Sequence, residues 1–122
     1  LKAMLNTLPV EITLVDENDI NIYFNEGEKV FTRPQMAIGR PVYSCHPKRV
    51  EPIVRMLISD FKKGKRDSLT ILSERSGHPV VINYFALRDD DGTYLGTLEA
   101  VQIIDGLADA IKNDKKGPID LR

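Results

Sequence analysis

The sequence predicts an α+β domain, in which a five-stranded antiparallel sheet is covered on one face by short helices and one long helix. Two observations support this fold class. Two long apolar runs, 80–88 and 94–104, flank an Asp-Gly turn, and that combination is a strong signal for a β-hairpin. An amphipathic stretch over 50–63 has helical spacing and is long enough to cover the sheet.

The N-terminal third of the chain predicts a helix end followed by a hairpin. Residues 1–8 have the spacing of the last turns of a helix, which Pro9 ends because the residue before a proline is pushed out of the helical region. Two alternating stretches then follow, 10–15 and 20–25, separated by an acidic turn. In the first, Val10, Ile12 and Leu14 face one way and Glu11 and Thr13 the other; in the second, Ile20, Ile22 and Phe24 share a face.

The middle and the end of the chain supply the remaining elements. Residues 26–47 lose periodicity and predict one or two helical turns in a compact irregular segment. A third strand is expected over 67–75, and a short helix followed by a frayed polar tail over 106–122. One face of the long helix carries its apolar side chains: Val50, Ile53, Val54, Leu57, Ile58 and Phe61.

Composition limits the classes of function. The 122 residues suit one domain, and a net charge of −1 with interspersed signs gives no electrostatic footprint for nucleic acid or an anionic membrane. The basic run Lys62-Lys63 with Lys65-Arg66 is interpreted as complementing a helix C-terminus. A single cysteine and the absence of an apolar span or signal peptide predict a cytoplasmic protein. The first residue is leucine, which favours a segment of a longer chain.

Several short motifs, in order and spacing, resemble those of PAS domains over residues 5–104. They are Leu8-Pro9, Asp16-Glu17-Asn18, Tyr23-Phe24-Asn25, Ile38-Gly39-Arg40, His46-Pro47, Arg88-Asp89-Asp90-Asp91-Gly92 and Leu95-Gly96-Thr97. More narrowly, three stretches are similar to those in PAS domains of certain bacterial proteins that also carry a hemerythrin-like cation-binding domain: 23–28, 39–47 and 94–99. The resemblance implies a PAS-like sheet over 9–105, preceded by a helix remnant at 1–8, and a sensory or dimerising module inside a larger bacterial chain.

Two motifs depart from the family's pattern. Where members commonly end the last strand in Asp-Ile-Thr, this chain has Gln102-Ile103-Ile104-Asp105. The light-sensing subgroup places a flavin-reactive cysteine in an Asn-Cys-Arg motif, whereas Cys45 lies outside any such motif. A flavin photosensor is therefore not expected.

A ligand cavity is predicted between the long helix and the sheet, because apolar and polar side chains converge there. The residues expected to line it are Phe31, Met36, Tyr43, His46, Val54, Ile58, Asn83 and Tyr84. The sequence does not identify the ligand or any cofactor.

Cys45-His46 is the only pair that suggests a catalytic or ligand role. The favoured interpretation is structural, with the His46 ring bonding to local backbone; a haem ligand is the alternative.

Other polar residues are interpreted as structural. Asp89, Asp90 and Asp91 form an acidic turn without the closing carboxylate of a calcium loop, His78 is expected in a solvated turn, and Glu99 is expected to face outward. No catalytic residue and no metal site is predicted. The favoured function is a ligand-sensing or interaction module; a purely structural homodimerisation domain, paired through Leu1, Met4, Leu5 and Leu8, comes second, and a small enzyme third.

Overall fold

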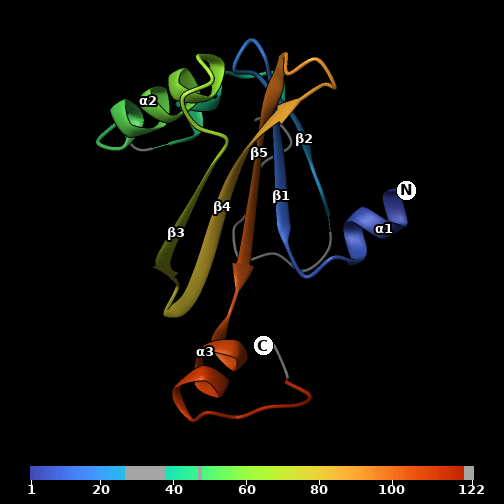
Figure 1. The fold of residues 1–122 in the computed structure, drawn as a ribbon, viewed down its shortest axis with the longest axis vertical. Coiled ribbons are helices and arrows are strands. Elements are labelled where there is room, and N and C mark those ends of the chain that lie inside the picture. Colours follow the sequence, from blue (N-terminus) through green and yellow to red (C-terminus); the bar gives the residue numbers. More distant parts are fainter. Residues whose placement is uncertain (27–37, 47, 120–122) are drawn as a thin grey trace.

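The computed structural model describes residues 1–26, 38–46 and 48–119, and its five antiparallel strands form one sheet in the order β2-β1-β5-β4-β3 (Figure 1). The predicted fold class, an α+β domain with a five-stranded antiparallel sheet, is confirmed. No helix within these residues is both long and apolar enough to cross a membrane. The elements are α1 (Lys2–Thr7), β1 (Glu11–Asp16), β2 (Asn21–Phe24), the 3-10 helix η2 (Val42–Cys45), α2 (Glu51–Lys62), β3 (Ser68–Arg75), β4 (His78–Arg88), β5 (Tyr94–Ile103) and α3 (Asp105–Lys112).

The last strand lies at the centre of the sheet, between β1 and β4. It pairs with β1 from Glu11 opposite Val101 to Asp16 opposite Gly96. At Gly96 the two backbones come so close that an added Cβ would overlap the carbonyl oxygen of Val15. Only glycine permits this approach, which explains the small residue between Leu95 and Thr97.

The helices α2 and η2 pack on one face of the sheet, which we call the inner face. Near α2, Val15, Val42 and Ile58 form a buried apolar cluster. Further along the strands, Val80, Ile82 and Val101 form a second cluster on the same face. Side chains of β4 are buried or partly buried on both faces of the sheet, as is typical of a strand with a neighbour on each side.

The first strand turns its polar side inward, which the alternation alone did not predict. Glu11, Thr13 and Val15 are only 2%, 7% and 3% exposed, whereas Ile12 and Leu14 are half-buried on the other face. The pairing with β5 forces this choice, because Val15 must join the apolar cluster under α2, and period-2 alternation then brings Thr13 and Glu11 to the same side.

The second strand contains a bulge that breaks the predicted face. Leu14 pairs with Tyr23, but the next residue, Val15, pairs with Asn21, so Ile22 is an extra residue in the ladder. Asn21 is consequently buried and Ile22 is 46% exposed. The expectation that Ile20, Ile22 and Phe24 share one face was therefore wrong.

The long helix is one residue shorter at each end than predicted, and its buried stripe is narrower. Leu57, Ile58 and Phe61 are buried, whereas Ile53 is 53% exposed. Ile53 lies in the first turn, where the helix has not yet reached the sheet (Figure 1).

Asn25 fastens the N-terminal helix to the sheet. Its buried side chain donates from Nδ2 to the carbonyl oxygens of Leu5 (2.9 Å) and Val10 (2.8 Å), and its Oδ1 accepts from the amide of Ile12 at 2.7 Å. All the hydrogen-bonding atoms of this amide group are used inside the fold. The stretch Tyr23-Phe24-Asn25 therefore has a structural role at its asparagine.

The C-terminal helix is attached to the far end of the β3–β4 hairpin. The amide of Ile104 donates to the carbonyl oxygen of Pro79, and His78 Nδ1 lies 2.7 Å from Asp105 Oδ2. His78 is exposed to solvent, as predicted, but it is the first residue of β4 instead of a turn residue, and it bonds to the first residue of α3.

Replacing Gly96 by alanine should lower the free energy of unfolding by about 2 kcal/mol or more, because the new methyl group meets backbone atoms that cannot move without breaking the β1–β5 ladder. Urea denaturation measures the change. Gly92→Ala is the control, since Gly92 has open space around it and should cost only about 1 kcal/mol for its positive φ. Equal losses in the two variants would contradict the close approach.

Candidate functional site

The structure contains a cleft of about 330 Å³ beside α2, on the side that faces η2. Its described lining residues are Tyr43, Arg55, Ile58, Ser59, Lys62 and Lys63. Four of these come from α2 at spacings of three and four residues and Lys63 is its C-cap residue, so one stripe of a single helix forms most of the wall. Tyr43, from η2, closes the other side. The volume is at the lower end of the range for small-molecule sites.

Tyr43 is held in place from two directions. Its hydroxyl donates to Asp19 Oδ2 at 2.9 Å, and the guanidinium of Arg55 lies over its ring, 3.9 Å from the centroid. Arg55 is fixed in turn by Nε and Nη2 bonds of 3.0 and 2.7 Å to Glu51 Oε1. Burial, and next the hydrogen bond to Asp19, raise the pKa of Tyr43 to about 12.

Asp19 is the point where three elements meet. It lies in the β1–β2 turn with a positive φ of 66°, a conformation that Asp tolerates better than most residues. Its carbonyl oxygen accepts from the amide of Val42, at the start of η2, at 2.7 Å. The ammonium of Lys62 lies 2.9 Å from its Oδ1, in the geometry of an ion pair and not of a directed hydrogen bond. The first hairpin, η2 and the end of α2 are thereby joined at one wall of the cleft.

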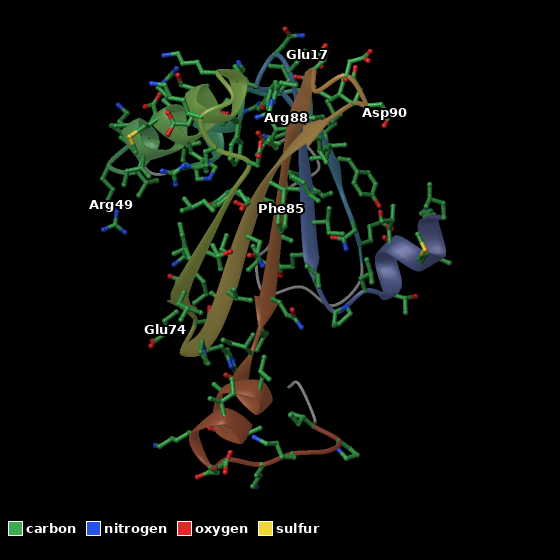
Figure 2. The ribbon with its side chains drawn as sticks, viewed as in Figure 1. Glu17, Arg49, Glu74, Phe85, Arg88 and Asp90 are labelled. Atoms are coloured by element: carbon green, nitrogen blue, oxygen red, sulfur yellow. The ribbon has the colours of Figure 1, made fainter. Side chains whose placement is uncertain are left out.

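Arg88, the last residue of β4, holds the C-terminal end of α2 from the half of the sheet that does not contain Asp19 (Figure 2). Its Nη2 donates to the carbonyl oxygens of Phe61 (2.6 Å) and Arg66 (3.3 Å), and its Nε to Asp67 Oδ1 at 3.1 Å. The Phe61 carbonyl also accepts from the amide of Gly64, just beyond the helix, at 3.2 Å, so Arg88 adds a second donor at the helix end. The cleft therefore lies on a helix whose C-terminal end is anchored to both β-hairpins.

A row of polar side chains crosses the inner face below the cleft. Glu99 pairs with Thr13 on one side and Tyr84 on the other, so these three side chains lie next to one another on the inner face. Burial, followed by the charge of Glu99, raises the pKa of Tyr84 above its ordinary value. The expectation that Glu99 faces outward was wrong, because Thr97 and Val101, two residues to either side, are buried on this face.

The structure brings together some of the predicted pocket residues and separates others. Tyr43, Val54 and Ile58 meet around the cluster beside the cleft. Tyr84 lies on the inner face, and Asn83, its neighbour in the strand, lies on the outer face, where its Oδ1 accepts from Thr70 Oγ1 at 2.6 Å. Consecutive strand residues point to opposite faces, so this pair does not share a cavity.

The remaining predictions concern residues near η2 or outside the described ranges. His46 Nδ1 lies 2.9 Å from the carbonyl oxygen of Val42, the local backbone bond that the structural interpretation expects. Phe31, Met36 and the side chain of Cys45 lie outside what the structure describes. Among the described residues, no group of three or more His, Cys, Asp or Glu could hold a metal ion.

Sequence reasoning missed the polar lining of the cleft. Arg55 and Ser59 are not part of the apolar face that the spacing identified, and Lys62 and Lys63 were interpreted only as complements to the helix dipole. The available signal was the spacing of polar residues along the helix edge. Asp19, however, lies far from them in sequence and gives no such signal.

One comparison with known proteins identifies a family. A family model described as a PAS domain matches residues 1–105. The C-terminal domain of a protein from Streptococcus mutans is 34% identical, with a TM-score of 0.77, and the match covers 84% of this chain and 81% of that one. A search among curated proteins found no match.

Two more distant structures share the fold. The PAS domain of a protein from Colwellia psychrerythraea is 20% identical, with a TM-score of 0.63 over 84% of this chain and 92% of that one. A sensory box sensor histidine kinase from Vibrio cholerae is 14% identical, with a TM-score of 0.60 over 84% and 86% of the two chains.

The raised pKa of Tyr43 predicts an alkaline loss of stability. The unfolded chain releases this proton near 10.0 and the folded chain only near 12, so the free energy of unfolding falls as the pH rises between these values. Urea denaturation should show a smaller fall in Tyr43→Phe, which keeps the ring under Arg55 but has no proton to lose. An identical fall in both proteins would mean that Tyr43 is not held in its neutral form.

Proposed function

The chain belongs to the PAS domain family, and from that premise we propose that it is a sensory and interaction module that binds a small ligand or a partner domain and contributes to signal transduction within a larger bacterial protein. PAS domains are generally sensory or interaction modules, and we propose no catalytic role for this one. A cytoplasmic location and a hemerythrin-like domain in the same parent chain belong to this proposal; they rest on the single cysteine and on the sequence resemblance.

The observation that carries the ligand-binding proposal is the cleft at the junction of α2, η2 and the first hairpin. A ligand there touches Tyr43 and Lys62, and both of these side chains are held by Asp19. Occupancy would therefore change the contacts between α2 and the β1–β2 turn. That is a direct physical route from binding to a rearrangement of the sheet edge.

Native mass spectrometry of the purified chain tests this proposal. A stoichiometric small molecule that is retained by the native protein and released on unfolding supports it. Ile58 also lines the cleft, but a charged residue at this buried position would unfold the chain, so Ile58→Glu would not test binding. Ser59→Leu instead fills the cleft from its half-buried edge and should abolish retention without unfolding the chain. If Ser59→Leu retains the ligand unchanged, the ligand binds elsewhere.

A haem absorbance band of the purified chain would favour the alternative in which His46 is an iron ligand.

Homodimerisation is the second candidate, and it is favoured by the surface of α1. Leu1, Met4 and Leu8 are 87%, 58% and 41% exposed, and no residue of this helix is buried. Figure 1 shows α1 projecting away from the sheet beyond β2. An exposed apolar stripe on a helix that Asn25 holds in place is a surface suited to a second copy of the chain.

Met4→Glu should shift the chain toward the 13.8 kDa monomer, because it places a charge in the middle of this stripe. Sedimentation velocity at micromolar concentration measures the change. Ala3→Glu adds the same charge to the same helix beside the stripe and should leave the dimer intact. A wild-type chain that sediments only as a monomer would remove this candidate.

A further inference from the structure

Positive charge is concentrated on α2 and its flanks. Residues 48–67 contain seven Lys and Arg against three Asp and Glu, a net charge of +4, in a chain whose total is −1. All of these residues are described by the structure, and Figure 2 shows side chains from this region extending from the surface of α2 and its flanking loops. The rest of the chain is correspondingly acidic. The electrostatic field at α2 is therefore opposite in sign to that of the whole molecule.

The cleft lies within this basic region, and its own lining also carries an excess of positive charge. Three cations line it, from Arg55, Lys62 and Lys63, and none of its described lining residues is acidic. Arg55 and Lys62 already face Glu51 and Asp19. Lys63 makes no ion pair with any residue in the described ranges, and its ammonium is available to a ligand.

The other lining groups define the rest of the ligand. The hydroxyl of Ser59 supplies a neutral donor beside Lys63, and the ring of Tyr43 and the side chain of Ile58 supply an apolar wall. A pocket of this size holds one aromatic ring or a short aliphatic body together with one acidic group. Ammonium and hydroxyl donors on one side and an apolar surface on the other match an amphipathic anion.

We propose that the cleft between α2 and η2 binds a small organic anion, with its carboxylate, phosphate or sulfonate at Lys63 and Ser59 and its apolar body against Tyr43 and Ile58. This inference rests on the proposed sensory function and specifies the ligand class. It also gives Lys62 and Lys63 a role beyond the helix dipole. The bound anion attracts Lys62 away from Asp19, and so weakens the ion pair that joins α2 to the first hairpin.

A titration of the full chain with phenyl phosphate at millimolar concentrations tests this proposal. Binding is measured by the NMR chemical shifts of the backbone amides. Benzylamine and benzyl alcohol serve as the cationic and neutral probes of the same shape, and inorganic phosphate as the probe without an apolar body. The expected result is saturable shifts at Tyr43 and along 55–63 with phenyl phosphate, weaker ones with inorganic phosphate and none with benzylamine. Shifts absent at α2, or as large with benzylamine, would overturn the proposal.

Two variants separate the cleft from the general basic field. Lys63→Gln should weaken phenyl phosphate binding at least about threefold, the loss expected for one partly exposed charge-assisted contact. Lys65→Gln removes the same charge two residues away, outside the cleft, and should change the dissociation constant less than about twofold. Equal weakening in both variants would show that the anion responds to the field of the surface and occupies no defined site.

Failure of the ligand class and failure of the sensory function give different results. If benzyl alcohol or benzylamine saturates the cleft and phenyl phosphate does not, the anionic class is wrong and a sensory cleft remains. If no probe binds and native mass spectrometry finds no retained molecule, the sensory cleft itself is wrong.

Discussion

The pairing of the first strand with the last is the constraint on which the rest of this structure depends. Because β5 lies between β1 and β4, the N-terminal hairpin and the three C-terminal strands form one continuous sheet. The close approach at Gly96 lets this ladder run as far as Asp16, at the edge of the first turn. Of the described elements between β2 and β3, η2 and α2 pack against the inner face, and α2 is the longer of the two.

The candidate site is a consequence of this closure. The β1–β2 turn and the β4–β5 hairpin are brought to the same end of the sheet, and each contributes one polar anchor to the end of α2. Asp19 pairs with Lys62 from one side, and Arg88 bonds to the Phe61 carbonyl from the other. A helix anchored by its C-terminal turn over a buried apolar cluster has its outer edge free, and the cleft forms along that edge against Tyr43.

The sequence was sufficient for the architecture because hydrophobic period and turn chemistry are local signals. The Asp-Gly hairpin, the five strands and the long helix all followed from them. The inward side of β1, the bulge at Ile22 and the inward Glu99 did not, because each is set by which strand lies next to it. For the same reason Asn83 and Tyr84 were assigned to one pocket, although alternation along a strand separates them. The polar lining of the cleft depends on Asp19, whose partners are distant in sequence.

Hydrogen exchange tests the central claim, that binding occurs beside α2 and is transmitted to the first hairpin through Asp19. Exchange would be compared between the chain purified under native conditions and the same chain refolded after its bound small molecules have been removed. The account predicts faster exchange after removal in the peptides that contain α2, η2 and the β1–β2 turn, with β3 and β4 unchanged. A change confined to α1 or to the outer strands, or no change at all, would contradict it.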